Sequence, residues 1–228
     1  MRNDIEGVAF DLDGTLYPNY RLNIRLLPIA AKEVRFLIAF SKVRKIIRKE
    51  QKNGIIQYDN FYKHQAEITA RLLNAPAELI KEKIDVFIYR GWEPLFKKVK
   101  LFSNVLETLA ALRGAGYKLG LLSDFPPEKK IEYLGLSGIW DAVHCSEYSG
   151  ALKPHPLSFI KIAGQMNLPP EKILYVGNSV PYDVAGASNA GMKTAWIRAS
   201  VLQNHGKKAP KPDFSFSNYR QLSNYMLH

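Results

Sequence analysis

Five short apolar segments, most of them leading into a stretch with helical spacing, constrain the fold of this 228-residue chain more than any other feature. These segments are typical of buried or half-buried strands and cover residues 5–10, 118–122, 142–145, 173–176 and 194–197. Helical spacing is found in residues 105–113, 129–134, 157–166 and 184–190. Because such alternation joins parallel strands through helices, we predict an α/β fold, a parallel sheet with helices on both faces.

The first two predicted strands are separated by about a hundred residues, which is too long for a simple crossover. Helical patterns in this segment cover residues 31–52, 59–73 and 76–89, and Pro76 suits a helix start. We therefore predict a core of residues 1–18 and 96–228, and an α-helical cap domain of residues 19–95 packed over the crevice. The polar residues 204–212 are expected to form a loop before a terminal strand or helix. An apolar stripe is predicted in the first helix of the cap, comprising Val34, Leu37, Ile38, Val43, Ile46 and Ile47.

Polar residues follow three of the predicted strands, and ligands of open parallel sheets bind beyond the carboxyl ends of strands. Asp11 follows the first strand, Ser123 ends the second, and Asn178 follows the fourth. Asp13 stands two residues after Asp11. Such a pair suits a nucleophile beside an acid/base, or the ligands of a hard cation, although Asp-x-Asp-Gly-Thr alone also fits a strand followed by an Asx turn.

A carboxylate that attacks a phosphate needs neighbours that neutralise negative charge. Ser123 offers a hydroxyl and nearby backbone N–H groups, and Lys153 offers an ammonium group before Pro154. Asn178 and Asp183 are oxygen ligands suited to Mg²⁺. Each residue alone has an ordinary interpretation as a turn residue, a surface lysine or a helix N-cap. Their joint occurrence near strand ends favours a phosphate-and-magnesium site.

With these four motifs, the chain resembles the haloacid dehalogenase-like superfamily of hydrolases, most of which are phosphatases. The motifs are Asp11-x-Asp13-Gly14-Thr15, Ser123, Lys153-Pro154 and Gly177-Asn178-Ser179-x3-Asp183-x2-Gly186-Ala187. The resemblance covers residues 5–197 and implies a Rossmann-like core. The insertion between the first two motifs is similar to the helical caps of some members.

The resemblance also implies a role for each matching residue. Asp11 would be the nucleophile and Asp13 the acid/base, while Ser123, Asp124 and Lys153 would hold the phosphoryl group. Asp124 stands where asparagine is common, so we expect its carboxylate to point away from the phosphoryl group. Its backbone N–H is expected to bind that group instead.

A Mg²⁺ ion would be bound by Asp11, Asp13 (through its carbonyl), Asn178 and Asp183. Asn178 replaces the usual aspartate, so we expect weaker metal binding than a carboxylate would give. Family dehalogenases generally lack the second aspartate, so the presence of Asp13 favours phosphate chemistry.

The resulting prediction is a Mg²⁺-dependent phosphatase that hydrolyses a small phosphorylated metabolite through an aspartyl-phosphate. A phosphomutase with the same core is the alternative. A third possibility is a nucleic-acid-binding or scaffolding protein on a weakened hydrolase core, since the net charge is +11 and basic residues crowd positions 42–52. On a helix, however, these basic side chains would mainly form a solvent-exposed face. We therefore expect no specific nucleic-acid partner.

The remaining features concern location and single side chains. No signal peptide is visible, no apolar segment is long enough to span a bilayer, and Cys145 is the single cysteine. A cytoplasmic protein with no membrane partner is expected, in which Cys145 is a buried structural thiol.

Most aromatic residues of the insertion (Phe61, Tyr62, Tyr89 and Trp92) are expected to pack in its core. Tyr17 and Tyr20 are candidates for substrate contact, and His155 is expected to be structural.

Overall fold

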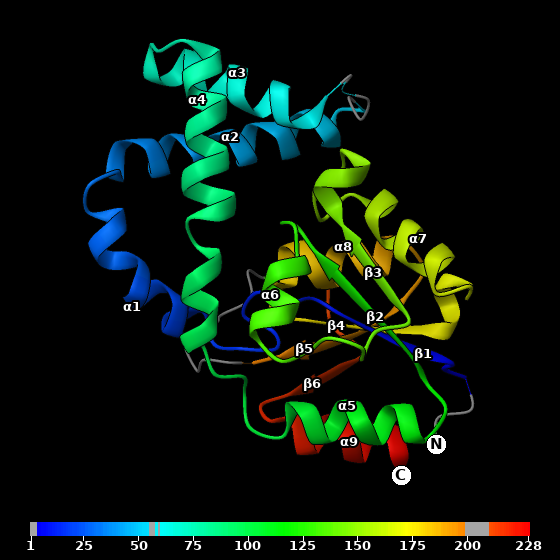
Figure 1. Ribbon diagram of the computed structural model, residues 1–228. Helices are drawn as coiled ribbons and strands as arrows, with labels where there is room; N and C mark the ends of the chain where they lie inside the picture. The colour runs from blue at the N-terminus through cyan, green and yellow to red at the C-terminus, as the bar shows by residue number, and fades with distance from the viewer. Residues whose placement is uncertain (1–3, 55–57, 59, 199–209) are drawn as a thin grey trace.

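The computed structural model describes residues 4–54, 58, 60–198 and 210–228 of the chain, and its centre is one parallel sheet (Figure 1). The sheet has six strands in the order β3-β2-β1-β4-β5-β6. Their bounds are β1 Gly7–Phe10, β2 Lys118–Ser123, β3 Ala142–Cys145, β4 Ile173–Gly177, β5 Lys193–Ile197 and β6 Phe214–Phe216. Since β1 pairs with both β2 and β4, the strand order reverses at β1, and the crevice of such a sheet opens there.

Side-chain alternation along the strands divides the core into two layers. Val8 and Phe10 of β1 belong to an apolar cluster on one face, with residues of α5 (Val105–Gly114), α6 (Glu128–Tyr133) and α9 (Tyr219–Leu227). Ala9 belongs to the cluster on the other face, with residues of α7 (Pro156–Gln165) and α8 (Ala185–Asn189). The predicted sheet with helices on both faces is therefore confirmed.

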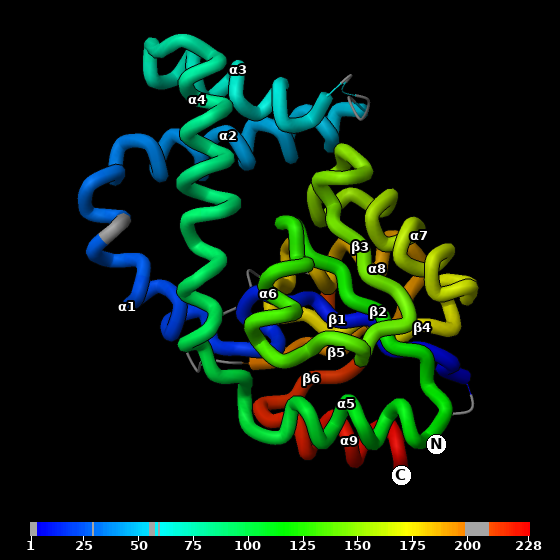
Figure 2. Tube along the Cα trace, viewed as in Figure 1, coloured from blue at the N-terminus to red at the C-terminus, as the bar shows by residue number. Residues whose placement is uncertain are grey.

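Most of the described chain between β1 and β2 is helical. The segment from α1 to η1, here called the insertion, comprises α1 (Asn19–Ala30), α2 (Val34–Lys52), α3 (Phe61–Leu73), α4 (Ala77–Lys83) and the π-helix η1 (Ile84–Arg90). It stands beside the sheet as a separate group of helices, coloured blue to green in Figure 2. Its apolar cluster includes Phe36 and Phe40 of α2 together with Ile80 and Ile84. The short helix η2 (Glu93–Lys98) leads back to the core.

The structure corrects the prediction for the insertion in two respects. A separate helix, α1, precedes α2 and contains Pro28, whereas the sequence pattern predicted helix only from residue 31. On α2, Val34 and Ile38 are about half exposed, because the helix turns Phe36, Phe40, Val43 and Ile47 inward instead. The Phe residues bury more apolar surface than Val34 and Ile38, which explains the rotated face.

The end of the chain is also defined. Both a strand, β6, and a helix, α9, close the core, where the sequence indicated one or the other. The loop predicted at residues 204–212 lies largely outside the described residues. Within the described part of the chain, no helix combines the length and the apolar character needed to cross a membrane.

Candidate active site

The nucleophile candidate Asp11 lies directly after β1 and is almost fully buried. Its Oδ2 accepts a hydrogen bond of 2.6 Å from the Thr15 hydroxyl, and its Oδ1 lies 2.6 Å from the Lys153 Nζ. Gly14 makes the tight turn between Asp11 and Thr15 possible, since its φ of 89° favours glycine. Asp11 is thus fixed in orientation by two partners.

Lys153 joins two carboxylates that lie beyond the carboxyl ends of β1 and β4. Its Nζ lies 2.7 Å from Oδ1 of Asp183 as well as 2.6 Å from Asp11. The second oxygen of Asp183 accepts hydrogen bonds from the backbone N–H groups of Asn178 and Ser179, at 3.1 and 2.9 Å. A Cβ on Gly177 would come within 2.3 Å of the Asp183 side chain, so the absence of a side chain there allows this close packing.

The charges in this cluster do not balance. Asp11 and Asp183 share one ammonium group. Burial raises the pKa of the Asp11 carboxyl to about 7. The positive charge of Lys153 lowers this pKa, and the negative charge of Asp183 raises it further. Burial by itself would lower the pKa of Lys153, but the two carboxylates raise it well above its usual value. An additional cation at this point would favour the ionised form of Asp11.

Asp13 has a different set of partners from Asp11. Lys130 of α6 donates to both carboxylate oxygens, at 2.9 and 2.8 Å, and the Tyr17 hydroxyl donates to Oδ1. The Lys130 Nζ also lies 5.3 and 5.2 Å from the ring centres of Phe96 and Phe125. Asp13 therefore faces a region with one fixed cation and aromatic walls.

That region is a cavity of about 200 Å³. Its walls come from the core and from the insertion, and they include Asp13, Tyr17, Trp92, Phe96, Phe125 and Lys130. The indole N–H of Trp92 is buried and has no hydrogen-bond partner among the described residues. Tyr89 also lines the cavity, whereas Phe61 packs in an apolar cluster as predicted. Tyr20 is mostly exposed and is not among the lining residues.

Ser123 ends β2 and Asp124 follows it, and the two residues differ in what they contact. The Ser123 Oγ is buried and accepts a hydrogen bond of 3.2 Å from the Phe125 N–H. The Asp124 carboxylate accepts from the Lys153 N–H at 3.0 Å and from Arg48 at 2.7 Å. The carboxylate of Asp124 thus points to the backbone of Lys153 and to the insertion.

Two basic side chains of α2 correct the prediction of a solvated face. Arg44 is buried, pairs with Glu147, and places its guanidinium carbon 4.1 Å from the ring centre of Phe125. Arg48 pairs with Asp124 and is only 17% exposed. In contrast, Lys45 and Lys49 are exposed as predicted. The difference arises because α2 has one side against the core, where charges need carboxylate partners.

A hard cation beside Asp11 would need amide and backbone oxygens in addition to carboxylates. The Asn178 side chain lies against Gly14, since a Cβ on Gly14 would come within 2.2 Å of Asn178 Nδ2. Among the described residues no group of three or more His, Cys, Asp or Glu side chains could hold a metal ion. A site here would therefore combine carboxylate, amide and carbonyl oxygens, a mixture that Mg²⁺ and Ca²⁺ accept.

The structure brings most of the sequence-predicted residues to one end of the sheet. Lys153 contacts both Asp11 and Asp183, while Asp13 is turned toward Lys130. Sequence patterns missed Lys130 and the roles of Arg44 and Arg48, since a lone lysine and a basic helix face are usually solvated. Cys145 is buried and His155 caps α7 by accepting from the Leu157 N–H, as expected for structural residues.

Comparisons with known proteins identify a family and several relatives of this chain. A family model described as haloacid dehalogenase-like hydrolase matches residues 5–191. The glyceraldehyde 3-phosphate phosphatase of Methanopyrus kandleri is 30% identical over 96% of this chain and 95% of its own. The phosphoglycolate phosphatase of Haemophilus influenzae is 25% identical over 97% and 98%. Among solved structures, the L-2-haloacid dehalogenase of Xanthobacter autotrophicus with chloropropionic acid covalently bound has a TM-score of 0.70 at 18% identity, covering 97% of this chain and 98% of the other.

Proposed function

The chain belongs to the haloacid dehalogenase-like hydrolase family, and from that premise we propose that it is a Mg²⁺-dependent phosphatase acting on a small phosphate monoester. The observation that carries the proposal is the contact of Lys153 with both Asp11 and Asp183 at the end of β1. The similarity to two phosphatases over nearly the whole chain supports it. The dehalogenase likeness, at 18% identity, supports the fold alone.

In the proposed mechanism, Asp11 attacks the phosphorus atom and the bond from phosphorus to the leaving oxygen breaks. Asp13 gives its proton to that oxygen, which leaves an aspartyl-phosphate on Asp11. Asp13 then takes a proton from water, whose oxygen attacks the phosphorus; the bond from phosphorus to the Asp11 oxygen breaks, which releases phosphate and restores the Asp11 carboxylate. Lys153, which contacts the nucleophile, and the groups around Ser123, at the end of the neighbouring strand β2, would hold the phosphoryl oxygens.

The metal would be held by Asp11, the Asp13 carbonyl and Asn178, with Asp183 beside them. It would supply positive charge where Asp11 and Asp183 leave a negative charge unbalanced. Asp183 would also orient Lys153, because it pairs with the Lys153 ammonium and is itself held by hydrogen bonds from two backbone N–H groups.

The cavity next to Asp13 would receive the leaving group. Its volume of about 200 Å³ suits a compact group rather than a nucleotide, and its apolar walls would exclude water. Lys130, which also lines the cavity, would donate hydrogen bonds to oxygen atoms of that group. The helices of the insertion contribute to these walls, so we propose that it serves as the cap of the enzyme.

The test is a panel of phosphorylated metabolites assayed for phosphate release with Mg²⁺, with and without EDTA. We expect hydrolysis of small monoesters, loss of activity in EDTA and recovery with added Mg²⁺. Asp11→Asn should lower kcat at least about 1,000-fold, because it removes the nucleophile. Retained activity in this variant would refute the mechanism. Transfer of the phosphoryl group to a sugar phosphate instead of water would identify a phosphomutase.

A further inference from the structure

One side of α2 is polar and lies along the core segment that carries Lys153. Gln51 donates to the Gly150 carbonyl at 2.6 Å and accepts from the Leu152 N–H at 3.1 Å. Arg44, about two turns earlier on the same helix, pairs with Glu147 at the start of this segment. The insertion therefore takes part in shaping the loop between β3 and α7.

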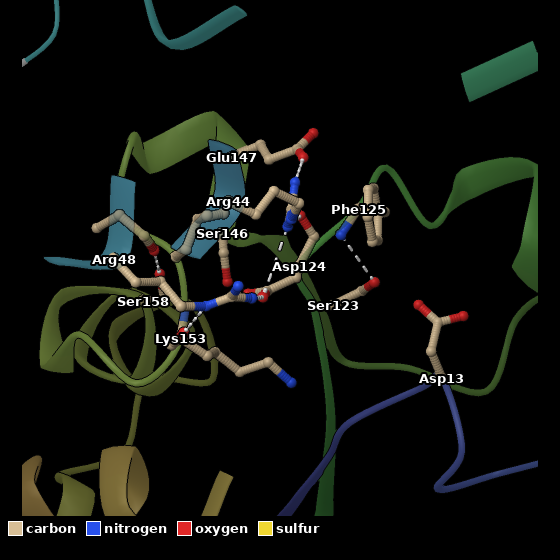
Figure 3. A network of polar contacts seen from close by, with 12 residues as sticks. Asp13, Arg44, Arg48, Ser123, Asp124, Phe125, Ser146, Glu147, Lys153 and Ser158 are labelled. Atoms are coloured by element: carbon tan, nitrogen blue, oxygen red, sulfur yellow. Dashed lines mark hydrogen bonds and ion pairs between the residues drawn. The ribbon is translucent and has the colours of Figure 1, made fainter. Parts of the chain in front are cut away.

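Arg48 makes the contact nearest to the site. Its Nε donates to the Lys153 carbonyl at 2.8 Å, and one terminal nitrogen donates to Asp124 Oδ2 at 2.7 Å. Figure 3 shows Arg48 beside the backbone of Lys153, whose side chain extends away from the insertion. The guanidinium carbon also lies 4.4 Å from the ring centre of Tyr182, the residue before Asp183. Arg48 thus contacts the three chain segments that follow β2, β3 and β4.

Asp124 completes the arrangement around Lys153. Its Oδ1 accepts from the Lys153 N–H at 3.0 Å, while its Oδ2 accepts from Arg48. The N–H and the carbonyl of Lys153 are therefore held by two side chains that are also bound to each other. A planar guanidinium can make these parallel contacts, and a lysine ammonium cannot reproduce them.

We propose that Arg48 is a positioning residue that holds Lys153 in place for the phosphoryl-transfer step, so that the insertion acts on the reaction through the backbone of Lys153. This inference rests on the proposed function. The Lys153 ammonium must meet Asp11, Asp183 and the phosphoryl oxygens at once, and a displacement of about 1 Å in such a site can lower a rate about 100-fold.

The kinetic test compares Arg48→Ala and Arg48→Lys with Lys49→Ala, a matched control that removes an exposed charge from the adjacent position. We expect Arg48→Ala to lower kcat about 10- to 100-fold and to change KM much less. The kcat of Arg48→Lys should be closer to that of Arg48→Ala than to that of the wild type, because lysine keeps the charge but lacks the planar guanidinium that makes both contacts. Lys49→Ala should match the wild type.

Two kinetic results would overturn the proposal. One is full recovery of kcat in Arg48→Lys. The other is an effect on KM alone that disappears at high salt. Either would show that Arg48 contributes only positive charge for attracting the substrate.

Hydrogen–deuterium exchange of the peptide containing Lys153 provides a readout that needs no substrate. Exchange in this peptide should be faster in Arg48→Ala and unchanged in Lys49→Ala, because the Lys153 N–H is held by the Asp124 carboxylate that Arg48 orients. Equal exchange rates in all proteins would overturn the proposal. If the wild type hydrolysed no phosphate ester, the proposed function would fail, and exchange would still decide whether Arg48 positions Lys153.

Discussion

At the scale of single residues, Asp13 is kept in its charged form by its neighbours. Burial by itself would raise the pKa of this carboxyl, but the Lys130 ammonium and the Tyr17 hydroxyl outweigh burial and lower it. An acid in the first step of the proposed reaction has to be protonated. A bound phosphate would favour this, because a nearby negative charge raises the pKa of a carboxyl.

Removing the charge of Lys130 tests this account. In Lys130→Met the pKa of Asp13 should rise, so its carboxyl should become protonated at a higher pH than in the wild type. The ¹³C chemical shift of the Asp13 carboxyl, followed by NMR over a pH titration, measures this directly. Lys129→Met is the matched control, since Lys129 is exposed and pairs with Glu132. An unchanged titration in Lys130→Met would show that Lys130 does not determine the charge of Asp13.

At the scale of elements, α2 has two functional sides. One is apolar and places Val43 and Ile47 against Phe61, Ile68 and Leu152. The other is polar and carries the side chains that contact the core. Since Leu152 precedes Lys153, the apolar packing and the polar contacts of α2 converge on the same loop. The helix is thus a shared part of the insertion and the site.

Two isoleucines of α2 give a matched test of this packing. Ile47 is fully buried and Ile38 is 52% exposed. Ile47→Ala should lower the free energy of unfolding by about 2–4 kcal/mol, because it leaves a cavity in the cluster. Ile38→Ala should change it by less than about 0.5 kcal/mol. Urea denaturation of both variants measures the difference, and equal effects would contradict the orientation of α2.

At the scale of the whole molecule, the insertion and the core meet through Asp124. Burial alone would raise the pKa of Asp124, but Lys153, Arg48 and Arg44 reverse this effect and lower it from 3.8 to about 2. A carboxyl whose pKa is lower in the folded protein stabilises the fold above its unfolded pKa. This contribution is then lost as the pH falls through about 2.

The prediction is a difference in acid stability between the wild type and Asp124→Asn. The wild type should be more stable at pH 5, with the charge of Asp124 contributing about 2 kcal/mol. That contribution should vanish as the pH falls from about 4 to about 2. Taking the difference between the two proteins cancels carboxyls that titrate equally in both. Urea denaturation at several pH values measures the difference, and one that stays constant with pH would be incompatible with a charge effect.

The sequence by itself determined the parallel sheet and the positions of its catalytic candidates. Apolar runs with polar ends define strands such as β1 and β4 to within a residue or two, because strand periodicity and turn residues are local signals. It also predicted that Asp11 and Asn178 would be neighbours, since parallel strands end at one edge of the sheet. These inferences need only short-range chemistry and the topology rules of α/β folds.

The tertiary structure alone decided which charges meet. Lys130 reaches Asp13 from 117 residues away, and Arg48 reaches the Lys153 carbonyl from 105 residues away. The local sequence does not reveal whether a lysine or arginine on an amphipathic helix has such a partner. The same sequence pattern fits a side chain exposed to solvent and one paired with a distant carboxylate. Only the packing of α2 and α6 against the core removes the water and makes these ion pairs part of the site.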